Sequence, residues 1–220
     1  MNRSSEKAKR KKWLPRQFSL TLALAMFTIA CIAMAWFNWT QRFARAAQAM
    51  EKMQVVVSYD AAWNNREKPQ PDSIPKWKAD IFGEDFCFEM NRLDIRQDSV
   101  ESSPNFWQDL AKHQSAMPAV EVVKLQKIKV TTEAIEVLAN LPLVEIFFFE
   151  CQLEDGVLES LSNFPKLRTV LFSEVQQDLN YRLLAKSQQL TQIGLEDCKI
   201  DLETAEHLRA KLPEAFVFVF

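Results

Sequence analysis

Glycine and histidine are scarce in this chain of 220 residues. The three glycines, Gly83, Gly156 and Gly194, form neither a P-loop nor the glycine fingerprint of a dinucleotide-binding fold. The two histidines, His113 and His207, belong to no HExxH motif, and no GxSxG motif marks a serine hydrolase. We therefore expect a protein that is not an enzyme and has no catalytic residue, no metal site and no cofactor.

Charge is distributed unevenly along the chain. Residues 1–17 carry seven Lys or Arg and one acid, so this tail has a net charge of +6, whereas the rest of the chain has −8. A basic tail on an acidic body argues against nucleic acid as a partner, because a nucleic-acid interface needs a basic patch on the folded part. No charged residue occurs between Gln17 and Gln41.

This uncharged stretch predicts a transmembrane helix over 18–40. Its core, residues 18–39, would extend roughly 33 Å as a helix, enough to cross the hydrocarbon core of a bilayer. Trp36 and Trp39 lie near its end, where indole rings favour the membrane interface. The basic residues of 1–17 then predict a cytoplasmic tail, with the residues after the span on the outer side of the membrane.

Two other interpretations of the same stretch remain open. Ala33-Met34-Ala35 has the small-x-small pattern of a signal peptidase site, and Cys31 is a weaker candidate for lipid attachment. A retained single-pass anchor is favoured because the apolar run continues beyond Ala35 into the two tryptophans. In all three cases the body of the protein is exported.

The segment between the membrane span and residue 118 has no repeat pattern for most of its length. Residues 41–53 are rich in good helix formers and predict a helical stalk. Residues 54–118 are expected to cap the fold, with a strand at 55–60, a proline-containing loop at 61–75, a degenerate first repeat, and an irregular or helical connector at 96–118.

From residue 119 to 220 the chain repeats every 23–24 residues. Pro118, Pro142, Pro165 and Pro213 are separated by 24, 23 and 48 residues. An apolar-x-x-apolar-x-apolar pattern recurs with this period; its first members are Val120, Leu143, Leu167 and Leu190. Met90-x-x-Leu93-x-Ile95 is an earlier copy, and Ala215-x-x-Phe218-x-Phe220 is predicted to be a truncated last one.

Repeats of this length with one strand and one helix are typical of leucine-rich repeats. The third unit is eroded, because Gln177 replaces an apolar residue that the other units keep. We expect an α/β fold: a short leucine-rich repeat solenoid with a parallel sheet on its concave face and helices on its convex face. The N-terminal transmembrane helix precedes it.

Specific segments strengthen this expectation. The stretches 129–142, 152–165 and 199–213 resemble the ITDAGL-type segments of bacterial leucine-rich repeat proteins. FSL, VSYD, PKW and GEDF, beginning at residues 18, 57, 75 and 83, resemble segments of planctomycete-type, membrane-anchored members of this ribonuclease-inhibitor-like superfamily. The resemblance covers nearly the whole chain and implies the architecture rather than a particular activity.

The four cysteines form no CxxC pair and no zinc spacing. Cys151 and Cys198 occupy the same repeat position two units apart. Parallel strands lie ~4.8 Å apart, so these residues should be roughly 10 Å apart, beyond the ~7 Å at which a disulfide forms. We expect small buried side chains in a repeat column.

The candidate binding site is on the concave face. Side chains alternate along a strand, so if Ile146 and Phe148 point into the core, Phe147 and Phe149 point the other way. Aligning the repeats places three more residues beside them, namely Val122, Lys124 and Leu171. Phe147, Phe149, Leu171 and Val122 are predicted to form an apolar patch in a polar surround, with Lys124 beside it, and such patches commonly mark partner sites.

Whether the chain covers this patch itself is left open by the sequence. The loop 61–75 or the connector 96–118 could fold over it with Trp63, Phe106 or Trp107. Self-coverage is slightly favoured, because the repeats are few and the connectors are long.

Three functions are compatible with these features. The favoured one is a membrane-tethered, non-catalytic protein-interaction module that binds another protein through the concave face. The alternative is a sensor or carrier for a small apolar ligand at Phe147 and Phe149. An enzyme would need a cluster of titratable groups on that face, and only scattered candidates such as Lys124 and Glu196 are evident there.

Overall fold

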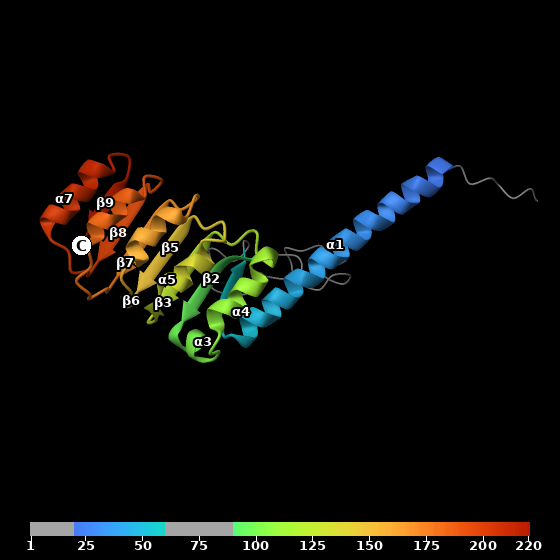
Figure 1. Ribbon diagram of the computed structural model, residues 1–220, viewed down its shortest axis with the longest axis horizontal. Coiled ribbons are helices and arrows are strands. Elements are labelled where there is room, and N and C mark those ends of the chain that lie inside the picture. The colour runs from blue at the N-terminus through green and yellow to red at the C-terminus, as the bar shows by residue number, and fades with distance from the viewer. Residues whose placement is uncertain (1–19, 60–89) are drawn as a thin grey trace, which may run out of the picture. The chain divides into compact units, whose positions relative to one another are not determined.

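The structure is a computed structural model that describes residues 20–59 and 90–220. It is an α/β fold with a seven-stranded sheet in the order β1-β2-β3-β5-β7-β8-β9 (Figure 1). The strands are β1 (Val56–Tyr59), β2 (Met90–Arg96), β3 (Val122–Gln126), β5 (Glu145–Phe149), β7 (Thr169–Ser173), β8 (Gln192–Glu196) and β9 (Phe216–Val219). All neighbours are parallel except β1, which runs antiparallel to β2.

Helices cover one face of this sheet (Figure 1). They are α3 (Gln97–Glu101), α4 (Phe106–His113), η4 (Gln114–Ala116), α5 (Thr132–Leu138), α6 (Val157–Ser160), η5 (Leu161–Asn163), η6 (Tyr181–Lys186) and α7 (Leu202–Lys211). The connector 96–118 is therefore largely helical. The Thr131 hydroxyl and the Asp201 carboxylate cap α5 and α7 by accepting hydrogen bonds from the backbone N–H groups of Ala134 and Thr204.

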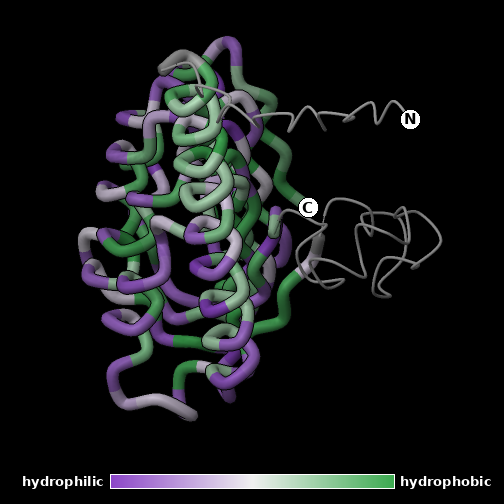
Figure 2. The backbone as a smooth tube through the Cα atoms, turned by 90° about the vertical axis from the view of Figure 1, so that its right-hand side faces the viewer, coloured by the Kyte–Doolittle hydropathy of each residue, from purple (hydrophilic) through white to green (hydrophobic). Residues whose placement is uncertain are grey.

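The strand register confirms the predicted repeat columns up to β8. Ile146 pairs with Val123 and Val170, and Phe148 lies in the equivalent column between Leu125 and Phe172. The Phe148 and Phe172 rings are stacked with their centroids 4.9 Å apart. Both are buried in one hydrophobic core with residues of the helices. Figure 2 shows hydrophobic and hydrophilic stretches alternating along the chain.

The eroded third unit lacks a strand that its two predecessors have. β4 (Lys129–Val130) and β6 (Gln152–Leu153) pair in a second, two-stranded sheet. The side-chain amide of Gln177 takes the place of a third strand. Its oxygen accepts a hydrogen bond from the Leu153 N–H, and its nitrogen donates one of 3.1 Å to the Leu153 carbonyl.

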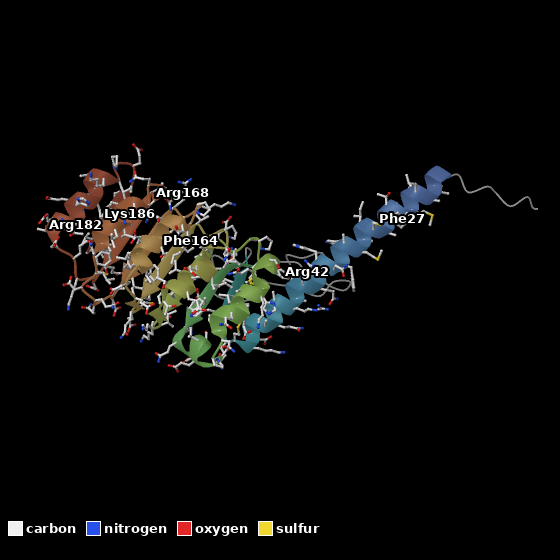
Figure 3. The ribbon with its side chains drawn as sticks, in the orientation of Figure 1. Phe27, Arg42, Phe164, Arg168, Arg182 and Lys186 are labelled. Atoms are coloured by element: carbon white, nitrogen blue, oxygen red, sulfur yellow. The ribbon has the colours of Figure 1, made fainter. Side chains whose placement is uncertain are left out.

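Helix α1 (Leu20–Lys52) is long and apolar enough to span a membrane. All side chains from residue 22 to 39 are exposed, including Phe27 (Figure 3). The chain divides into two compact units between Asn38 and Trp39, within this helix. The predicted stalk 41–53 is helical up to Lys52, but it is not a free stalk, because it packs into the core of the second unit.

The core-facing side of this helical segment follows from its sequence. Phe43, Ala46, Met50 and Met53 are at most 7% exposed and belong to the same hydrophobic core as the sheet. Phe43, Ala46 and Met50 are three and four residues apart and so lie on one side of α1, and Met53 follows the end of the helix. The end of α1 is therefore a structural part of the repeat-containing unit.

Candidate functional site

The candidate site lies on the distal face, which we define as the side of the seven-stranded sheet opposite helices α5, α6 and α7. The central column of this face runs through Lys124, Phe147, Leu171, Gly194 and Phe218. One flanking column runs through Val122, Glu145, Thr169, Gln192 and Phe216. The other contains Gln126, Phe149, Ser173 and Glu196.

The structure brings the five predicted residues together on this face. Phe147 pairs with Lys124 on one side and Leu171 on the other, and all three side chains are partly buried. Phe149 is also partly buried, whereas Val122 is only 5% exposed. Val122 consequently offers almost no surface, and the accessible part of the predicted patch consists of the other four residues.

Lys124 makes a specific contact within the patch. Its ammonium nitrogen lies 4.1 Å from the centroid of the Phe149 ring. A cation at this distance is attracted by the negative face of an aromatic ring. Two of the predicted site residues, Lys124 and Phe149, thus interact directly, and the lysine occupies one face of the Phe149 ring.

The prediction for the last repeat was wrong by one residue. Val217 pairs with Ile193 and Val219 with Leu195, so these valines continue the core columns. Phe216 and Phe218 therefore point to the distal face, and Phe218 is not a core residue. A shift of one residue moves every side chain of a strand to the other face. The sequence FVFVF is apolar on both faces, so its hydrophobic pattern could not determine the register.

The aromatic side chains of β9 enlarge the patch beyond the sequence prediction. The Phe218 ring centroid lies 5.7 Å from that of Phe216 and 5.4 Å from that of Phe220, with which it is stacked. Phe216 is 71% exposed and Phe220 63%. The sequence contained a signal for these residues. If the register of FVFVF is moved by one residue from the predicted one, all three phenylalanines point to the distal face.

Gly194 allows the Phe218 ring to lie close to the sheet. A Cβ atom at Gly194 would be 2.6 Å from Cε2 of Phe218 and 3.1 Å from Cδ1 of Leu171. The missing side chain leaves this space to the phenylalanine, which is therefore in line with Leu171. The apolar part of the central column extends from Phe147 on β5 to Phe218 on β9.

Charged side chains divide the distal face into two halves. At the β2–β3 end, Arg92 and Asp94 form an ion pair of 2.7 Å, and Lys124 lies over its phenylalanine. At the β7–β9 end, Glu196 on the distal face and Glu174 and Asp197 at the adjoining strand ends form no ion pair with any residue in the ranges that the structure describes. The aromatic end of the patch is thus also the acidic end.

One of the two predicted covers of the patch is excluded. Phe106, in the connector 96–118, is 2% exposed and belongs to the core, and Trp107 packs against that core. Helix α4, which carries both residues, lies beside α5 on the helix-covered face. The connector was expected to be a possible cover because of its aromatic residues, but these fill the helix side instead. The loop 61–75 and Trp63 lie outside the described residues.

Cys151 and Cys198 are free thiols, and they occupy equivalent positions as predicted. Each thiol donates to the carbonyl two residues earlier, at 3.3 Å in both cases. Cys151 is buried, whereas Cys198 is only partly buried. Burial raises the pKa of both thiols, so the thiolate, which is the reactive form, is disfavoured.

Among residues 20–59 and 90–220, no group of three or more His, Cys, Asp or Glu side chains is arranged to hold a metal ion. Known proteins add no further assignment. No protein-family model matches the chain, and no curated protein is significantly similar to it.

Proposed function

We propose that residues 119–220 form a short leucine-rich repeat solenoid, with the distal face as its concave side. Each sequence unit of 23–24 residues contributes one parallel strand in register with the last, and the segments between strands lie on the other side. This arrangement supports the proposal because a single unit cannot bury its apolar side, and stacking units creates a continuous core.

We propose further that the protein is a membrane-tethered, non-catalytic protein-interaction module. Helix α1 would anchor it in a bacterial cytoplasmic membrane with the basic tail inside and the sheet on the periplasmic side. The observation that carries the proposal is the apolar row from Phe147 through Leu171 to Phe218 along the central column of the distal face. Burying each such ring against a partner is worth roughly 2–3 kcal/mol, and a few aromatic anchors commonly dominate an interface.

Site-specific photo-cross-linking in native membranes tests this proposal. A photoreactive residue at Gln192, which is exposed on the distal face, should give a discrete adduct with another protein, whereas one at Glu206, exposed on α7, should not. The Phe147→Ala/Phe149→Ala variant should lower the Gln192 adduct at least fivefold. Equal adducts from both positions, or none from Gln192, would contradict the proposal.

The melting temperature of the double variant separates binding from self-coverage. A melting temperature within about 2 °C of the wild type, together with a lost adduct, assigns the patch to a partner. A fall of many degrees instead shows that the chain covers its own patch. A reporter fused to the C-terminus should be active only on the periplasmic side, and a cytoplasmic signal would overturn the proposed orientation.

A further inference from the structure

The β7–β9 end of the distal face combines two chemical features that point to one kind of occupant. The first is an exposed aromatic surface. Phe218 lies beside Leu171 over the space left by Gly194, and the Phe220 ring is stacked on it with 63% of its surface exposed. An apolar side chain of a partner can contact this surface without displacing any side chain of residues 20–59 and 90–220.

The second feature is negative charge next to these rings. The strand register places Glu196 beside Phe220, because Leu195 pairs with Val219 and the Phe220 carbonyl accepts a 2.9 Å hydrogen bond from the Asp197 N–H. Glu174 belongs to the same rim, since its N–H donates to the Glu196 carbonyl, also at 2.9 Å.

The backbone conformation fixes these acidic residues at the end of the strands. Lys127, Glu150, Glu174 and Asp197 follow successive strands, and each has a positive φ between 48° and 58°. The first two neutralise each other, with 3.2 Å between the Lys127 ammonium and the Glu150 carboxylate. Glu174 and Asp197 continue the same row but have no such counterpart in the described part of the chain.

The protein itself shows how a cation binds to this face. At the opposite end of the patch, the Lys124 ammonium sits over the Phe149 ring, so a positive side chain already uses an aromatic surface there. At the β7–β9 end the rings and carboxylates are present and the cation is not supplied by the described residues. The body of the chain also carries a net charge of −8, which favours the approach of a basic partner.

We infer that this end of the distal face binds a peptide segment of a partner protein in which an aromatic or aliphatic residue adjoins Lys or Arg. The apolar side chain would rest on Leu171 and Phe218. The cationic group would lie over the Phe220 ring, between Glu174, Glu196 and Asp197. This inference rests on the proposed binding function and specifies the chemistry of the partner.

Selection of peptides on the full-length protein tests the inference. A random twelve-residue phage library is panned against the wild type in lipid nanodiscs, and enriched peptides are then synthesised. We expect them to carry Lys or Arg next to Phe, Tyr, Trp or Leu. Their affinity should fall at least tenfold for the Glu174→Lys/Glu196→Lys variant and should weaken with salt.

The matched control is Glu136→Lys/Glu206→Lys, which changes the net charge equally but at exposed positions on α5 and α7. It should leave peptide affinity within twofold of the wild type. Circular dichroism of both variants verifies that the fold is kept. If both variants weaken binding equally, the effect comes from overall charge, and the assignment to the β7–β9 end is overturned.

The Leu171→Ser variant distinguishes a failure of this inference from a failure of the proposed function. One possible outcome is that the enriched peptides are neutral or acidic and bind the Glu174→Lys/Glu196→Lys variant as well as the wild type, but bind Leu171→Ser more weakly. That outcome overturns the inference and keeps the distal face as a binding site. Peptides indifferent to Leu171→Ser, or no enrichment at all, contradict both. A dimer that dissociates in Leu171→Ser, without peptide binding, would identify a second copy of the chain as the occupant and overturn the inference.

Discussion

Gln177 shows how one residue can interrupt the repeat pattern without loss of structure. It stands where the other units have an apolar residue, so from the sequence the third unit is eroded at this position. Its amide instead bonds both backbone groups of Leu153 and so ends the small β4–β6 sheet. A side chain with one donor and one acceptor group can substitute for the two backbone groups of a neighbouring strand.

Replacing Gln177 by leucine tests this role. Leucine restores the apolar residue of the other units but leaves the N–H and carbonyl groups of Leu153 without partners. We expect the free energy of unfolding to fall by roughly 1–3 kcal/mol, the usual cost of unsatisfied buried polar groups. Urea unfolding of the full chain in mild detergent, followed by circular dichroism, measures the change.

The neighbouring residue provides the control for this substitution. Gln176 donates to the Asp197 carbonyl at an exposed position. Gln176→Leu should therefore change the free energy of unfolding by no more than about 0.5 kcal/mol. If Gln177→Leu leaves the stability unchanged or raises it, apolar packing matters more at this position than hydrogen bonding does.

Some features of the candidate site could be predicted from single residues, and others could not. The directions of Phe147 and Phe149 followed from the alternation of side chains and the repeat columns, and the register confirms them. The contact of Lys124 with the Phe149 ring did not follow, because it depends on the rotamer of a flexible side chain. Gly194 was likewise unremarkable in sequence until Phe218 was placed over it.

At the scale of whole elements, the two ends of the repeat array were the hardest to predict. The inner strands β3, β5, β7 and β8 each carry the apolar pair of the repeat pattern, and aligning these pairs fixes their register. In β9 both sides are apolar, so the parallel pairing with β8 decides which valines enter the core. At the other end, the helical segment before β1 had the composition of a stalk, and composition does not tell whether a helix face is buried.

Met50 tests whether the end of helix α1 belongs to the core of the second unit. Its side chain is fully buried, whereas that of Gln48, in the same turn, is exposed. Met50→Ala should leave a cavity and lower the free energy of unfolding by roughly 2–5 kcal/mol. Gln48→Ala should have an effect within about 0.5 kcal/mol, since it changes only an exposed side chain.

Urea unfolding of both variants, monitored by tryptophan fluorescence, gives the comparison. The substitutions lie in the same helix and both introduce alanine, so differences in helix propensity are small. A stalk that is independent of the sheet would give nearly equal stabilities for the two variants. Such a result would show that burial of Met50 contributes little to the stability of the second unit.

Ion pairs on the helix-covered face connect neighbouring units. Arg182 on η6 pairs with Glu203 on α7 at 2.7 Å, and Lys186 on η6 pairs with Glu159 on α6 (Figure 3). Exposed ion pairs of this kind typically contribute less than 1 kcal/mol each. The continuous hydrophobic core therefore remains the main source of cohesion between units, and we expect the sheet to unfold as a whole.

A cooperative unit of this kind should lose stability in alkali, because three weakly acidic side chains in successive units are buried or partly buried. Burial is the main cause that raises the pKa of Cys151 and Cys198 above the ordinary 9.0. Burial also raises the pKa of the Tyr181 hydroxyl far above the ordinary 10.0, and the nearby Cys198 adds to that shift. The folded chain keeps these protons at a pH where the unfolded chain releases them.

The free energy of unfolding should consequently fall as the pH rises, since above pH 9.0 the unfolded chain binds fewer protons than the folded one. The decline should begin near the ordinary thiol pKa and steepen above 10.0, where an unfolded Tyr181 ionises. Each group contributes at most roughly 1.4 kcal/mol per pH unit, and nothing well below pH 8. Urea titrations from pH 7 to 11 measure this slope.

The Tyr181→Phe variant tests the contribution of the tyrosine, because phenylalanine cannot ionise. Above pH 10 its stability should fall less steeply than that of the wild type, by up to roughly 1.4 kcal/mol per pH unit. An unchanged slope would show that Tyr181 ionises equally in the folded and unfolded states.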